Sequence, residues 1–247
     1  MIPIKTGAEL ERIRVSGALL RDVFTGLEDM IRPGTTTAEL DAAAEEMIRS
    51  RGGAPAFKGY QGYPATICAS INEQVVHGIP GSRALAEGDI IGVDIGVVLD
   101  GFYSDATRTY PVGEVSEEAR RLMRVTGEAL DRGIEMARPG NRLSDISHAI
   151  QKHAESHGYS VVRALVGHGI GRRMHEEPQI PNFGPPGKGP ELLAGMVLAI
   201  EPMVNVGTWE VLTLEDAWTF VTVDGKLSCH FEDTVAVTDA GPEILTR

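Results

Sequence analysis

Two stretches near the start of the chain carry apolar residues at the three- and four-residue spacing of an amphipathic helix. The first follows a capping box, Thr6-Gly7-Ala8-Glu9, and runs toward a stop signal at Pro33-Gly34. The second opens at Thr36 and ends at Gly52-Gly53. We therefore predict two consecutive helices in this part of the chain.

A near-continuous apolar run from Ile90 to Leu99 predicts a strand, and Asp100-Gly101 after it is a strong hairpin signal. With these two residues as the turn, Asp94 faces Thr107, and Asp105 is its diagonal neighbour on the same face of the sheet. Diagonal side chains lie about 7–8 Å apart. The two carboxylates are thus close enough to converge on one cation.

The order of elements then repeats. A second helix pair is predicted from Ser116 to Gly158, followed by strands and loops. Met30-Ile31-Arg32-Pro33-Gly34 matches Met136-Ala137-Arg138-Pro139-Gly140, and the segment ending at Asp94 matches one ending at Glu201. Chance recurrence of a helix stop is the alternative, but the shared order favours duplication. We predict an α+β fold of two pseudo-twofold halves, with helices outside, strands inside and a site where the halves meet.

Composition narrows the class of protein. The 247 residues carry a net charge of −12, with 42% hydrophobic and 23% charged residues, which excludes a disordered or fibrous chain. No apolar stretch approaches the ~18 residues of a membrane span. The acidic balance argues against sequence-independent nucleic-acid binding. Two cysteines, Cys68 and Cys229, fit neither a disulfide framework nor a Cys-x-x-Cys site, and the N-terminus has no signal-peptide pattern, so we predict a cytoplasmic location.

Four acidic residues stand in or beside predicted strands, where a carboxylate is rarely buried without a partner. They are Asp94, Asp105, Glu201 and Glu232. A structural ion pair is a reasonable explanation for any one of them. For all four together, bound cations explain the pattern better.

Histidines accompany these acids. His77 and His168 both precede Gly-Ile, and His175 follows seven positions after His168. Glycine beside a histidine lets a ligand approach the backbone closely. The loop around His168 lacks the Gly-Lys-Ser/Thr of a phosphate-binding loop, so we set that alternative aside. His153 and His157 lie one helical turn apart with no carboxylate-rich strand around them, and we expect them on a solvated face.

The ordered set of Asp94, Asp105, His168, Glu201 and Glu232 resembles the dinuclear metal site of the methionine aminopeptidases, in peptidase family M24 with the creatinase-like pita-bread fold. The resemblance covers nearly the whole chain, and its further motifs are Gly62-Tyr63-Pro64, His77-Gly78-Ile79-Pro80, Gly167 to Gly171, His175-Glu176-Glu177-Pro178 and Ala199-Ile200-Glu201-Pro202-Met203. The short span from His168 to Glu201 has no room for the helical insertion of type II enzymes. No Cys/His-rich zinc-binding extension precedes the core, so the chain resembles the bacterial-style type I enzymes.

This resemblance implies one catalytic domain over residues 1–247, with an inner curved antiparallel sheet and outer helices. It implies removal of N-terminal methionine from nascent proteins and peptides whose second residue is small. Two divalent ions of Co, Mn, Fe or Zn are the implied cofactors. We expect a monomer that meets its substrates at the ribosome, without direct nucleic-acid or membrane binding.

The resemblance also implies residue roles. The expected metal ligands are Asp94, Asp105, His168, Glu201 and Glu232, with Asp105 and Glu232 bridging both ions. Glu201 is also the expected general base, His175 the oxyanion stabiliser and His77 a contact to the scissile amide. The expected wall of the methionine pocket consists of Phe57, Tyr60, Tyr63, Cys68, Met174 and Trp218. For Phe57 and Met174, ordinary core packing is an equal alternative.

One position departs from the family pattern. Asp233 stands where a histidine is common, and an extra acid beside Glu232 could change metal affinity or the hydrogen bonding of Glu232. Three other functions are alternatives: an Xaa-Pro aminopeptidase or prolidase, a non-catalytic binding protein of the same fold, and metal storage. The first usually has a further N-terminal domain, the second would lack ligands, and the third does not explain His77 and His175.

Overall fold

Each predicted helix near the N-terminus is present in the computed structural model, which describes residues 1–247. Helix α1 spans Gly7–Leu27 and α2 spans Thr37–Ser50, and both begin at complete capping boxes. Helix α1 ends earlier than the predicted stop, because the chain tightens into a 3-10 turn at Glu28–Met30. The capping boxes therefore predicted both helix starts correctly, whereas the Pro33-Gly34 signal placed the end of α1 too late.

A hairpin forms the centre of the first sheet. Strand β4 (Ile90–Leu99) pairs antiparallel with β5 (Phe102–Pro111), and also with β1 (Ala54–Pro55) and β2 (Ile67–Ile71). Asp100 and Gly101 have φ of 50° and 78°, which is the left-handed backbone that this tight turn requires. Asp94 pairs with Thr107 and Gly96 with Asp105, so the predicted register is confirmed.

The second half repeats the plan of two helices followed by antiparallel strands. Helix α3 spans Glu117–Glu135 and α4 spans Leu143–Ser156. The main sheet has the order β15-β14-β9-β7-β8, with bounds Gly241–Ile244, Asp233–Thr238, Val197–Ile200, Val166–Gly169 and Glu176–Pro181.

Two smaller sheets complete the strand layer. One has the order β13-β10-β6, with bounds Ser228–His230, Met203–Asn205 and Ser160–Val161. The other has the order β11-β12-β3, with bounds Val211–Thr213, Phe220–Thr222 and Gln74–Val76. A 3-10 turn at Tyr60–Gly62 lies between β1 and β2. The inner strand layer is antiparallel throughout, as predicted, and its strands divide into four hydrogen-bonded sheets.

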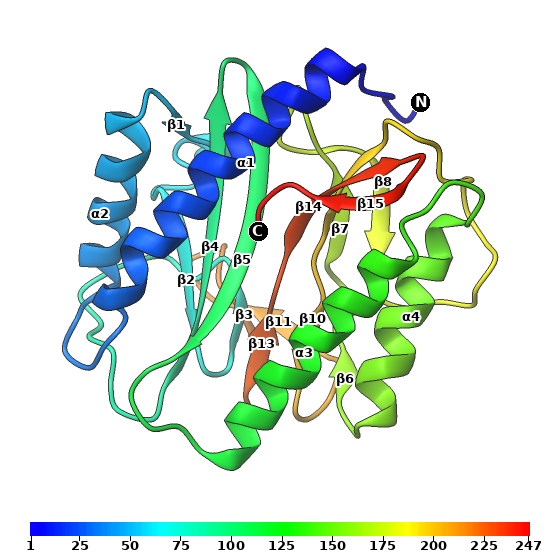
Figure 1. Ribbon diagram of the computed structural model, residues 1–247. Coiled ribbons are helices and arrows are strands. Elements are labelled where there is room, and N and C mark those ends of the chain that lie inside the picture. The colour runs from blue at the N-terminus through cyan, green and yellow to red at the C-terminus, as the bar shows by residue number, and fades with distance from the viewer.

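The helices form the outer layer, as predicted from the repeated order of elements. Helix α1 crosses the β4–β5 hairpin, while α3 and α4 lie side by side over the strands of the second half (Figure 1). Each half has its own apolar core, of 18 residues under α1 and α2 and 24 residues under α3 and α4. None of the helices has the combined length and apolar composition that crossing a bilayer needs.

Polar contacts from β5 join the two halves. Thr107 and Glu232 exchange two backbone hydrogen bonds, at 3.3 and 3.0 Å. The Thr234 hydroxyl accepts from the Asp105 amide at 3.0 Å and donates to the Asp105 carbonyl at 2.8 Å. These hydrogen bonds place acidic residues of the two halves next to each other.

Candidate metal centre and substrate pocket

Carboxylates from both halves meet where β5 contacts the second half. Asp94 and Asp105 come from β4 and β5, Glu201 directly follows β9, and Glu232 lies between β13 and β14. Ligand atoms of Asp105, His168 and Glu232 lie within 4.8 Å of one another. His168 Nε2 is 3.8 Å from Asp105 Oδ2 and 3.7 Å from Glu201 Oε1. The five expected ligands therefore converge on one cavity.

The donor set fits divalent cations. Asp94 Oδ1, Asp105 Oδ1 and Glu232 Oε1 are buried, and none has a hydrogen-bond partner in the protein. His168 Nδ1 donates to the carbonyl of Gly169 at 2.9 Å, which leaves the lone pair on Nε2 facing the carboxylates. Unpartnered buried oxygens are costly in a protein, and metal ions are a standard way to satisfy them.

The pKa values of the cavity groups also indicate that the carboxylates need a positively charged partner. Burial raises the pKa of Asp94 to about 7, and burial together with the neighbouring carboxylates raises the pKa of Asp105, Glu201 and Glu232 above their usual values. Burial lowers the pKa of His168 to about 3. The imidazole is thus neutral at pH 7, as a metal ligand must be.

The two histidines without an expected ligand role line the same cavity. His175 Nδ1 is 2.8 Å from the Tyr60 hydroxyl, and its ring centre is 4.3 Å from that of His168. His77 follows β3 with φ of 60°, an uncommon backbone for a residue other than glycine. Its ring packs edge-on against Trp218 and Phe220. Both rings thus line the cavity that contains the carboxylates, and each packs against aromatic neighbours.

A cavity of about 600 Å³ opens onto the carboxylates. Every residue expected in the site lines it, including the six side chains of the expected methionine pocket. Cys68, Tyr63 and Ala65 form a small buried apolar cluster, and Phe57 and Trp218 pack against it. Tyr63 and Trp218 meet edge-to-face with ring centres 5.0 Å apart. This wall offers an apolar, sulfur- and aromatic-lined surface to a side chain.

Two residues of the site were not predicted. His230 Nε2 is buried, has no hydrogen-bond partner, and lies 3.8 Å from Glu201 Oε2. The Thr107 hydroxyl donates to Glu232 Oε2 at 3.0 Å. A signal for His230 was present, because it lies two positions before Glu232 on the same strand segment and so shares its face. Nothing local in the sequence connects Thr107 to Glu232.

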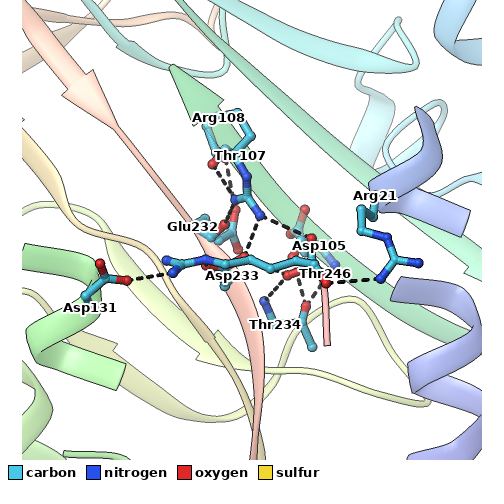
Figure 2. Close-up of polar contacts among 10 residues, drawn as sticks. Arg21, Asp105, Thr107, Arg108, Asp131, Glu232, Asp233, Thr234 and Thr246 are labelled. Atoms are coloured by element: carbon cyan, nitrogen blue, oxygen red, sulfur yellow. Dashed lines mark hydrogen bonds and ion pairs between the residues drawn. The ribbon is translucent and has the colours of Figure 1, made fainter. Parts of the chain in front are cut away.

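Asp233 points away from the cavity. Its carboxylate is fully buried and accepts from Arg108 at 2.6 Å, from Arg247 at 2.7 Å and from the Thr246 hydroxyl at 2.8 Å. Figure 2 shows the Arg108 side chain reaching Asp233 and the backbone of Glu232, and it donates to the Glu232 carbonyl at 2.5 Å. The extra acid therefore has its own cationic partners and does not lie among the expected ligands.

The loop that carries His175 is fastened to the N-terminal segment. Glu176 pairs with Lys5, and both side chains are only 3% exposed. The other carboxylate oxygen of Glu176 accepts the amides of Arg172 and Arg173 at 2.8 and 3.1 Å. These contacts hold the turn before His175 in one conformation.

The sequence matches metallopeptidase family M24 over residues 11–239. It is 56% identical to the methionine aminopeptidase of Clostridium perfringens, over 100% of this chain and 99% of that protein. The structure superposes on the methionine aminopeptidase of Rickettsia prowazekii with a TM-score of 0.99, at 43% identity and with 100% of each chain covered. The prolidase of Pyrococcus furiosus is less similar, with a TM-score of 0.81 and 25% identity, and only 65% of that chain is covered.

Proposed function

The chain belongs to metallopeptidase family M24, and we propose that it removes the N-terminal methionine from peptides and nascent proteins whose second residue is small. The observation that carries this proposal is the convergence of five ligand-type side chains on one apolar-walled cavity, in a chain similar over its full length to methionine aminopeptidases. It is a metal-dependent exopeptidase with the pita-bread fold of that family.

The proposed cofactors are two divalent ions held by Asp94, Asp105, His168, Glu201 and Glu232. Four ionised carboxylates and a neutral imidazole carry a charge of about −4, which two such ions balance. Oxygen-rich ligation with one histidine suits Mn, Fe, Co or Zn. When bound, the ions supply Lewis acidity, which activates a water molecule and polarises the scissile carbonyl.

Glu201 is the proposed general base. Its carboxylate takes a proton from the attacking water and delivers it to the leaving amine. Burial and the carboxylate of Glu232 raise the pKa of Glu201, so in the cavity it accepts a proton more readily than an exposed glutamate. Its buried neighbour His230 lies 3.8 Å away, with Nε2 directed at Glu201 Oε2.

His175 and His77 contact the substrate in this proposal. The Tyr60 hydroxyl faces His175 Nδ1, so donation from Tyr60 leaves the proton on Nε2. That N–H is then available to the carbonyl oxygen as negative charge develops on it. Burial lowers the pKa of His77 to about 4, so His77 is a neutral hydrogen-bonding group that positions the amide.

Substrate choice follows from the shape and charge of the cavity. The apolar wall, including Phe57, Cys68 and Trp218, takes the methionine side chain. The free amino group of the substrate is held at the carboxylate cluster, which limits cleavage to the first peptide bond. We also propose that residues 1–247 act as one catalytic domain and a monomer in the cytoplasm, on chains emerging from the ribosome.

A chelation and peptide panel tests the activity. The protein is stripped with a chelator, reloaded separately with Mn, Fe, Co or Zn, and assayed on Met-Ala, Met-Gly and Xaa-Pro peptides. We expect no turnover without metal, recovery with at least one ion, and cleavage of the Met peptides only. Turnover after complete metal removal, or preference for Xaa-Pro peptides, would overturn the proposal.

A further inference from the structure

A second cluster of metal-binding side-chain types lies on the outer layer, between α3 and α4. We propose that Glu128, His153 and His157 bind a divalent cation of the zinc class, independently of the catalytic cavity. None of the three lines that cavity. The sequence pattern alone suggested a solvated face for the two histidines, because it did not show that Glu128 of the preceding helix lies against them.

The distances suit a small cation. One ligand atom from each side chain lies within 4.8 Å of the other two. His153 Nε2 and Glu128 Oε2 are 3.0 Å apart. In a tetrahedral zinc site with bonds of about 2.0–2.1 Å, neighbouring ligand atoms are about 3.3–3.4 Å apart. A cation that replaces the proton shared by His153 and Glu128 would therefore separate these two atoms by only a few tenths of an ångström, and His157 would move closer to complete the site.

The free nitrogen of His157 is already fixed by its surroundings. Its Nδ1 is 2.9 Å from the carbonyl of His153, which can only accept, so Nδ1 carries the proton and Nε2 keeps the lone pair. The two rings are one helical turn apart with centres separated by 4.6 Å. Two histidines at i and i+4 on one helix face are a known zinc-binding arrangement.

Glu128 is also oriented for binding. Arg124 donates to Glu128 Oε1 at 2.9 Å, and this contact leaves Oε2 directed at His153. The same hydrogen bond from Arg124, with the contact to His153, lowers the pKa of Glu128 and keeps its carboxylate ionised. Two imidazoles and one carboxylate suit zinc better than calcium or magnesium, which prefer oxygen ligands alone.

Glu128 and His153 lie on α3 and α4, which pack against each other, and His157 is the C-cap residue of α4. Residues of α3 and α4 belong to the same buried core, including Leu122, Val125, Ile146 and Ile150. A Cβ at Gly133 would lie 2.8 Å from Ile150, so this glycine permits the close approach of the helices. A bound cation would join α3 to α4 and stabilise the folded state by an amount that grows with the logarithm of the free cation concentration above Kd.

Zinc stoichiometry tests the site. We expect wild-type protein to bind one more equivalent of zinc in calorimetric titration than the His153→Ala/His157→Ala double variant. The double variant should keep wild-type aminopeptidase activity, because neither residue is in the catalytic cavity. His148→Ala, on the same helix but outside the cluster, is the matched control and should bind as wild type.

Two further measurements locate the ion. Crystals soaked in zinc should show an anomalous peak between α3 and α4, and Glu128→Gln, which keeps the side-chain size, should lose it. Equal stoichiometry in the wild type and the double variant would overturn the proposal. So would a wild-type crystal without the peak, or loss of the extra equivalent in His148→Ala.

Discussion

His168 and His175 are neighbours in the cavity, and their Nδ1 atoms have different hydrogen-bond partners. His168 donates from Nδ1 to a backbone carbonyl, which turns the Nε2 lone pair toward the carboxylates. His175 faces a tyrosine hydroxyl with the same nitrogen, and a hydroxyl can donate as well as accept. The first arrangement suits a metal ligand and the second suits a hydrogen-bond donor to substrate. Residue type alone does not distinguish these two roles.

Substitution of the two histidines that we propose to contact substrate should separate catalysis from metal binding. We expect His175→Ala to retain both metal equivalents and to lose roughly 10²–10³ in kcat, the usual effect of removing one oxyanion donor. His77→Ala should also retain metal, with its loss divided between KM and kcat. Calorimetry and steady-state kinetics measure these effects. His168→Ala is the control that should lose metal affinity, and loss of an equivalent in His175→Ala would instead make His175 a ligand.

Tyr60 should act through His175. Tyr60→Phe keeps the ring but removes the hydroxyl, so His175 loses the hydrogen bond that selects its tautomer. One hydrogen bond of about 0.5–1.5 kcal/mol corresponds to a decrease of roughly two- to tenfold in kcat, with little change in KM. Tyr110→Phe, outside the cavity, is the matched control. A decrease in Tyr60→Phe that appears only in KM would assign Tyr60 to substrate binding.

Glu201→Gln should lower kcat by several orders of magnitude. The amide can neither accept the proton of the attacking water nor supply a full negative charge to the metal site. Rates are compared at saturating metal, so that weaker metal binding alone does not account for the loss. A variant with a rate near that of the wild type would remove Glu201 from the mechanism.

At the scale of elements, side chains of the segment from β13 to β14 point alternately to opposite sides. One side faces the cavity and the other faces buried ion-pair partners. His230 and Glu232 face the cavity, whereas Asp233 faces Arg108 and Arg247 on the reverse side. Arg108 also donates to the backbone carbonyls of Thr107 and Glu232. One guanidinium therefore neutralises the buried acid and fastens the strand segment that carries Glu232.

Loss of Arg108 should destabilise the protein more than loss of Arg247. Arg108→Ala removes the less exposed partner of Asp233; breaking a buried pair costs about 3–5 kcal/mol, and we expect the lower end of this range because Arg247 still pairs with Asp233. Arg247 is 42% exposed, so Arg247→Ala should cost about 1 kcal/mol or less. Urea unfolding of both variants with metal bound measures the difference. Equal losses would contradict the dominant part given to Arg108.

Local features of the sequence are sufficient to predict several elements of the fold. The capping boxes at Thr6 and Thr36 and the Asp100-Gly101 turn each depend on residues within a few positions, and the turn fixed the register that brings Asp94 beside Asp105. Partners of Asp233 and of His175 could not be predicted, because Arg247, Arg108 and Tyr60 reach them from distant elements. The ligand and catalytic roles were implied by family resemblance, and they stay predictions until the variants above are measured.

For the whole molecule, the cavity groups predict how stability depends on pH in the metal-free protein. Buried acids with raised pKa hold protons that the unfolded chain has lost, so their contribution to stability falls as pH rises. Buried histidines with lowered pKa act oppositely, but only below about 6.5, where the unfolded histidines gain protons. The two effects oppose each other below pH 6.5, and only the acids act above it.

We therefore expect the metal-free protein to lose stability from pH 6.5 to 8.5. Asp94, with a pKa of about 7, titrates within this range. Each proton held only by the folded state contributes about 1.4 kcal/mol per pH unit until it is lost. Urea unfolding at several pH values measures the slope. The metal-loaded protein should show a weaker dependence, because its carboxylates are already ionised, and a rise in metal-free stability over this range would contradict the argument.

The hydrogen bond between Thr107 and Glu232 joins residues separated by 125 positions, and it has a kinetic consequence. Contacts of such long sequence separation close large loops and form slowly in folding. The helix pair of each half and the β4–β5 hairpin of the first half can form early in folding. The cavity is complete only after the two halves dock. During refolding, helical circular dichroism should recover before turnover does. The rate at which enzyme activity recovers should therefore measure the docking of the two halves.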